Sequence, residues 1–104
     1  MVHVTQQAKE ALLITKRRAG IDDPEVGLRL MFGHDRSLGL IQDRRKAGDE
    51  VVKHHDATVL LVDPEISALA VTGRVIDCRR SSDGRMQFVL RRSTDAERRS
   101  SSAA

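Results

Sequence analysis

Apolar residues recur along this chain with two periods, which indicate one long helix and several strands. Between Gln6 and Ala19 there is neither Gly nor Pro, and the apolar spacing is that of a helix. Thr5 precedes this segment as a predicted N-cap, and Gly20 follows it as a predicted stop. The predicted helical face carries Ala8, Ala11, Leu12, Thr15 and Ala19.

Alternation with a period of two predicts strands in much of the remaining chain. In the segment Gly27 to Phe32, the apolar Leu28 and Leu30 alternate with Arg29 and Met31. The β-branched, apolar run Thr58–Val62 predicts a central strand that is covered on both faces. Further predicted strands are 3–4, 50–54, 74–80 and 86–90, with an apolar segment at 38–42.

A second, short helix is predicted to begin after Asp63, with Pro64 in its first turn. Ile66, Leu69 and Ala70 form its predicted buried side. Ser81–Gly84 is a predicted hairpin turn that ends in the favoured Asp-Gly pair. Strands dominate and helices do not alternate with them, so the predicted class is α+β, with mixed and antiparallel strands.

A chain of 104 residues has room for one domain, which we assign to residues 1–92. We expect residues 93–104, rich in Ser and Arg and without periodicity, to be a disordered tail. The core must be aliphatic, because Phe32 and Phe88 are the only aromatic residues. A single cysteine excludes an intrachain disulfide and points to a reducing compartment. No segment reads as a signal peptide or membrane span, so we expect a cytoplasmic protein with no membrane partner.

The order of these segments resembles the A-type carriers of iron–sulfur cluster assembly, the HesB/IscA-like family. The resemblance rests on His3-Val4-Thr5 before the first helix, the strand from Gly27, Gly48–Val52, the strand 59–62 with Asp63-Pro64, Leu69, and Gly73–Asp77. It spans roughly residues 2–90, and it implies a HesB-like fold, mostly β, with an N-terminal helix and a short second helix. Members of this family carry iron or iron–sulfur clusters, usually as dimers or tetramers.

The cluster ligands of the family are not found at the matching positions of this chain. The family takes one cysteine from a Gly-Cys-Ser-Gly loop after the first long strand and two from a Cys-Gly-Cys near the C-terminus. Here the loop reads Gly33-His34-Asp35-Arg36-Ser37, with the cysteine position near Asp35, and no cysteine follows Leu90. Thiolates match iron in a sulfide core, whereas Asp, Arg and Ser do not, so the resemblance in fold does not bring the chemistry with it.

Three residues remain as candidate metal ligands, namely His34, Asp35 and Cys78. Imidazole with carboxylate suits Fe(II) or Zn(II), and Cys78 is the only thiol. A lone cysteine beside Ile76 is more often a small buried hydrophobe, although nearby arginines would activate it if it were exposed. The pair His54 and His55, with Asp56, shares one metal only if it lies in a turn, since adjacent strand residues point to opposite faces.

Charge is nearly balanced over most of the chain, although the formal net charge is +3. Four basic clusters would suit phosphate or RNA if they converged, at 16–18, 44–46, 79–80 and 91–92. Acidic residues compensate them, and no exposed aromatic residues are expected to stack on bases, so we do not predict a nucleic-acid partner. No catalytic constellation is visible, and we expect a protein that is not an enzyme.

Two functions of different classes therefore remain open. The first is a HesB/IscA-like interaction or accessory module that has lost its cluster ligands, binds no cofactor, and works with a protein partner or as a homo-oligomer. The second is a residual carrier of iron or an iron–sulfur cluster, using His34, Asp35 and Cys78 in an oligomer. For a homodimer, the candidate contact is Leu38–Ile41.

Overall fold

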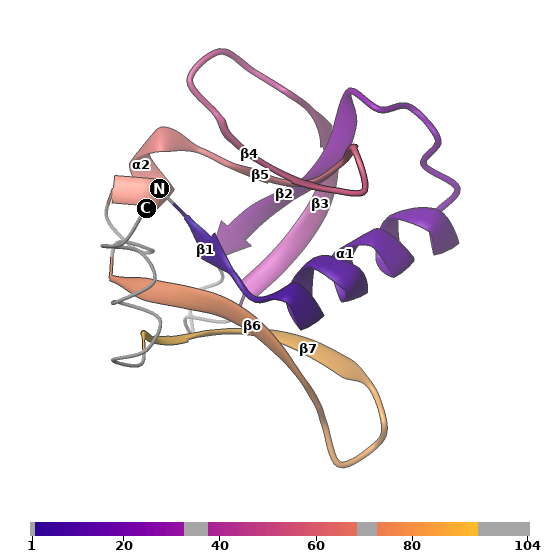
Figure 1. The fold of residues 1–104 in the computed structure, drawn as a ribbon, viewed down its shortest axis with the longest axis vertical. Helices are drawn as coiled ribbons and strands as arrows, with labels where there is room; N and C mark the ends of the chain where they lie inside the picture. Colours follow the sequence, from indigo (N-terminus) through magenta and orange to yellow (C-terminus); the bar gives the residue numbers. More distant parts are fainter. Residues whose placement is uncertain (1, 33–37, 69–72, 94–104) are drawn as a thin grey trace.

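Two small sheets enclose an aliphatic core in the computed structural model, which describes residues 2–32, 38–68 and 73–93, and one long helix packs beside them (Figure 1). The fold is α+β and mostly strand, as the sequence predicts. In chain order the elements are β1 (His3–Val4), α1 (Gln6–Arg18), β2 (Val26–Phe32), β3 (Leu38–Arg44), β4 (Glu50–His54), β5 (Ala57–Val62), α2 (Pro64–Ile66), β6 (Arg74–Arg80) and β7 (Met86–Arg92).

The larger sheet has the strand order β3-β2-β5-β4, and the smaller one has the order β1-β6-β7. Both sheets are mixed: β2 and β5 are parallel, as are β1 and β6, and the remaining pairs are antiparallel. The predicted central strand 58–62 is confirmed, because β5 lies between β2 and β4 and its residues from Thr58 to Val62 are all buried.

Helix α1 begins at Gln6 as predicted and ends at Arg18, one residue before the predicted end at Ala19, which is its C-cap. Its buried face is rotated from the prediction. The Thr5 hydroxyl accepts a hydrogen bond from the backbone N–H of Ala8, and Gly20 follows the C-cap with a positive φ of 73°. The buried residues are Ala8, Ala11, Leu12, Leu13 and Lys16. The prediction was wrong for Thr15 and Ala19, which are exposed. Lys16 takes the place near the sheet because its long side chain reaches a backbone carbonyl there.

The turn between β4 and β5 is a tight two-residue turn, as predicted for His55 and Asp56. Both residues adopt positive φ angles, 51° and 64°, which is the backbone of a hairpin turn that matches the twist of the flanking strands. Asp63 caps α2 as predicted, its carboxylate accepting from the N–H of Glu65. Ile66 is half-buried, whereas Leu69 and Ala70 lie outside the described residues.

Candidate functional site

The three predicted metal ligands are not brought together within the described residues. His34 and Asp35 belong to the segment 33–37, which lies outside them. Cys78 lies on β6 and is buried against Ala8 and Ala11 of α1, with Val4 and Phe88 packed around the same cluster. In the parts of the chain that the structure describes, no group of three or more His, Cys, Asp or Glu side chains is arranged to hold a metal ion.

The environment of Cys78 makes its sulfur a poor ligand and a poor nucleophile. Cys78 is only 5% exposed. Burial raises the pKa of its thiol, and the nearby Asp77 carboxylate acts in the same direction. Reactive cysteines have a lowered pKa and access to solvent, because the thiolate is the species that attacks and ligates. Cys78 therefore has the features of a packing residue in this structure.

His54 and His55 lie at the end of β4 and in the following turn, and their rings are close. The ring centroids are 4.1 Å apart with the planes tilted by 51°. His54 is buried, and its Nε2 has no hydrogen-bond partner among the described residues. This nitrogen is enclosed by protein, so the proximity of the two rings does not create an accessible pair of ligands.

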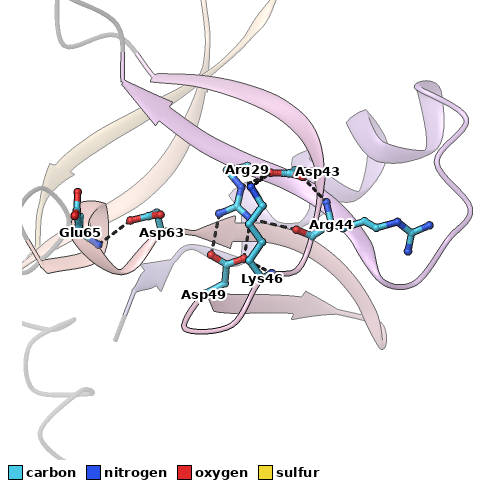
Figure 2. Close-up of polar contacts among 7 residues, drawn as sticks. All are labelled: Arg29, Asp43, Arg44, Lys46, Asp49, Asp63 and Glu65. Carbon is cyan, nitrogen blue, oxygen red and sulfur yellow. Dashed lines mark hydrogen bonds and ion pairs between the residues drawn. The ribbon is translucent and has the colours of Figure 1, made fainter.

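The most developed polar site of the described chain is centred on Arg29, which the alternation in its strand does not identify as a buried residue. Arg29 is 7% exposed, and its guanidinium donates to two carboxylates (Figure 2). Its Nη1 and Nη2 donate to Asp49 at 2.8 and 2.7 Å, and its Nε donates to Asp43 at 2.6 Å. Nη2 also donates to the backbone carbonyl of Arg44 at 3.2 Å.

This arrangement holds the connection between β3 and β4 against the outer face of β2. Asp49 also accepts from the backbone N–H of Lys46, and Lys46 Nζ lies 3.4 Å from Asp43 (Figure 2). The hydrogen bonds from Arg29 are the main reason that the pKa values of Asp43 and Asp49 lie below their ordinary range, and the same contacts raise the pKa of Arg29. Since the guanidinium already makes four hydrogen bonds, we interpret this site as a structural ion-pair cluster rather than a binding site.

Two further polar contacts join elements that are distant in sequence. The Nζ of Lys16 donates to the backbone carbonyl of Thr58 at 2.9 Å, and burial is the main cause that lowers the pKa of this lysine. Asp77 accepts from the Thr5 hydroxyl at 2.8 Å and from Arg91 Nε at 3.0 Å. Burial opposes ionisation of Asp77 most strongly, yet the hydrogen bonds together hold its pKa below the ordinary value. These contacts fasten α1 to both sheets.

The Arg29 site is not evident from the sequence, because its partners are separated along the chain. Asp43 and Asp49 are 14 and 20 positions from Arg29. The one available signal was an arginine inside an otherwise apolar strand, which indicates a buried partner only once the neighbouring strand and loop are known.

Within the described residues, α1 is the longest helix, and no helix has the length and apolarity needed to cross a bilayer.

Comparison with known proteins shows the fold. No family model and no curated protein matches the sequence. The solved structures that are similar over most of their length include the following two. A protein from Aquifex aeolicus, determined by solution NMR, has a TM-score of 0.61 at 21% identity, covering 88% of this chain and 91% of that one. Escherichia coli SufA, described as involved in the biosynthesis of iron–sulfur clusters, has a TM-score of 0.55 at 20% identity, covering 88% and 84%.

Proposed function

We propose that this chain is a non-catalytic HesB/IscA-like protein that serves as a cytoplasmic interaction or accessory module related to iron–sulfur cluster carriers. Its similarity in fold to SufA supports the relation to cluster assembly. The observation that carries the proposal is the state of the only thiol: Cys78 is buried among apolar side chains, and burial raises its pKa. A protein with this fold and this donor set keeps the shape of a carrier without the thiolates.

The donor set does not fit an iron–sulfur cluster held by one chain. Such a cluster is bound by four cysteine thiolates or, in some proteins, by two cysteines with two histidines. This chain has one cysteine, and forming its thiolate inside an apolar cluster is unfavourable. Even two copies would bring only two thiols.

The described surface offers a contact for a second copy at β3, the outer strand of the larger sheet. Ile41 is directly opposite Arg29 and Met31 is directly opposite Gly39, so Ile41 and Met31 project from the same face of the sheet. Ile41 is 48% exposed and Met31 is 40% exposed. We propose a homodimer contact at Leu38–Ile41 in which Ile41 is the apolar side chain presented to the second copy, because Leu38 and Leu40 pack against the core.

Light scattering after size exclusion tests this dimer with a matched pair of variants. Ile14 on α1 is as exposed as Ile41, at 49%, so Ile14→Glu controls for adding a charge at an exposed isoleucine. We expect a dimeric wild type, a monomeric Ile41→Glu variant and a dimeric Ile14→Glu variant. A wild-type protein that stays monomeric at high concentration contradicts the dimer.

Anaerobic reconstitution with Fe(II) and sulfide tests the proposal that no cluster is bound. The wild type is compared with Cys78→Ala and with the double variant His34→Ala/Asp35→Ala, and a [2Fe–2S] ferredoxin reconstituted in parallel is the positive control. Wild-type protein that retains neither iron nor sulfide supports the accessory role. Iron that is lost in the double variant supports a residual carrier instead. A chromophore that is lost in Cys78→Ala contradicts the structural interpretation of Cys78.

A further inference from the structure

Positive charge is concentrated on one hairpin, although the chain as a whole is close to balanced. Residues 73–93, which contain β6 and β7, hold six arginines against two aspartates, a formal charge of +4. Residues 1–72 hold ten Lys and Arg against eleven Asp and Glu, a charge of −1. The near balance of charge along the chain therefore does not hold for this hairpin.

The turn end of the hairpin extends away from the larger sheet (Figure 1). Except for the half-buried Ser81, every residue from Arg79 to Gln87 is exposed. We name Arg79, Arg80, Arg85 and Met86 the hairpin tip. Arg85 lies 3.6 Å from the Asp83 carboxylate. Neither Arg79 nor Arg80 has an acidic partner in the part of the chain that the structure describes.

An exposed apolar side chain lies on the same face of the hairpin as Arg80. Met86 is directly opposite Arg80 across the β6–β7 ladder, and its residue is 43% exposed. Two residues further along the strand, Phe88 is directly opposite the buried Cys78 and packs toward the core. Met86 therefore lies on the continuation of the core face, beyond the point where other described residues cover it.

The edges of the ribbon are also open at the tip. The strand β1 pairs with β6 only at Val75 and Ile76, and its chain turns into α1 at Thr5. The strand β7 is the outer strand of its sheet. Between Arg79 and Gln87 the described backbone makes strand pairs only within the hairpin, so an extended segment has free backbone groups to pair with.

We propose that the hairpin tip binds an extended acidic segment of a partner protein. An extended segment paired to the edge of the ribbon presents alternate side chains to its two faces. Its carboxylates pair with Arg80, on the face that carries Met86, and with Arg79 on the opposite face, and its apolar residue packs on Met86. Arginine and methionine together are enriched in protein–protein interfaces. A single-stranded nucleic acid is less suited, because it binds through aromatic stacking and the tip has no aromatic residue. This inference goes beyond the proposed function and does not depend on it.

Fluorescence anisotropy with defined probes tests the proposal on the full chain. The first probe is a labelled peptide of about 12 residues, rich in Glu and Asp, with one central leucine, and the second replaces that leucine with serine. Labelled single-stranded RNA and double-stranded DNA are the nucleic-acid probes. The variants are Arg79→Glu/Arg80→Glu at the tip and Met86→Gln. The matched control is Arg17→Glu/Arg18→Glu, which reverses an exposed adjacent arginine pair on α1.

We expect the tip double variant to weaken binding of the leucine peptide at least about tenfold, and the α1 control by less than about twofold. Met86→Gln should weaken binding of the leucine peptide but not of the serine peptide. Equal losses in the two arginine variants would show that only net charge matters and would overturn the proposed location. Binding of RNA or DNA more tightly than the peptide, at matched salt, would overturn the proposed partner, as would no peptide binding at low salt. A circular dichroism spectrum of each variant checks that it folds.

Discussion

Arg29 on β2 and Asp49, which precedes β4, form a bidentate ion pair. Nη1 and Nη2 of Arg29 donate to the carboxylate of Asp49 at 2.8 and 2.7 Å. The two side chains are 8% and 2% exposed. Their pairing fixes the loop between β3 and β4 and holds the guanidinium in a buried position with four hydrogen bonds already made. We therefore interpret this charged cluster as structural.

Asp49→Asn should destabilise the fold by about 2–4 kcal/mol, because it removes one charge of a buried pair and leaves the other incompletely paired. Urea unfolding followed by circular dichroism measures this loss. Glu10→Gln, which neutralises an exposed carboxylate on α1, is the matched control and should change stability by less than about 0.5 kcal/mol. If the two variants are equally stable, the ion pair of Arg29 with Asp49 does not stabilise the fold.

The free energy of unfolding should decrease in acid, and part of the decrease should come from the aspartates that Arg29 binds, Asp43 and Asp49. The folded-state pKa values of Asp43 and Asp49 lie below the ordinary value of an aspartate, mainly through hydrogen bonds from Arg29. A lowered folded pKa contributes stability that is complete above the unfolded value and is lost as the pH falls through the folded value. The free energy of unfolding should therefore decrease below about pH 4, and less steeply in Asp49→Asn. Identical acid slopes in the two proteins would contradict this cause.

A methyl group at Gly27 should destabilise the fold through a steric clash with Thr58, and a second substitution at Thr58 should relieve that clash. A Cβ at Gly27 would lie 2.8 Å from Cγ2 of Thr58 on the neighbouring strand. We expect Gly27→Ala to cost about 1–3 kcal/mol and Thr58→Ser, which removes that methyl group, to rescue part of the loss in the double variant. A double-mutant cycle of unfolding free energies measures the coupling.

Gly39 on the next strand is the control for this clash. Among the described residues, a Cβ there would meet only the Cβ of Met31, at 4.0 Å, which is an ordinary contact. Gly39→Ala should therefore leave stability within about 1 kcal/mol of wild type. A similar loss at both glycines would point to backbone effects instead of the contact with Thr58.

Cys78 should react with a thiol reagent only when the protein opens. Burial and the raised pKa predict labelling by DTNB at least about 100-fold slower in the native protein than in urea. Cys78→Ser should destabilise more than Cys78→Ala, since it buries a hydroxyl in an apolar cluster. Fast labelling of the native protein would show an accessible thiol and remove the support that burial gives to the proposed function.

Most elements of the fold follow from local patterns, whereas the polar sites depend on long-range pairing. Thr5, Gly20, Asp63 and the turn at His55 are identified from the sequence because caps and turns are determined by neighbouring residues. Lys16 and Arg29 are not, because each is buried only when a partner on another element satisfies it. The same limit applies to the hairpin tip, since average charge along the chain hides where the arginines gather.

The roles of His34 and Asp35 stay predictions, because the segment 33–37 lies outside the described residues. Cys78 is better defined, because its strand, its packing against α1 and the raised pKa of its thiol are all given by the structure. A sequence resemblance can therefore indicate the fold, which the structural likeness to SufA supports, while the chemistry has to be inferred from the donors that are present.

The amount of iron and acid-labile sulfide that the wild-type chain retains after anaerobic reconstitution and desalting decides whether the chain binds a cluster. We predict that both stay at background and that no visible absorption appears, with the parallel ferredoxin fully reconstituted. Iron and sulfide bound in equal and stoichiometric amounts, with a stable chromophore, would contradict it and identify the chain as a cluster carrier.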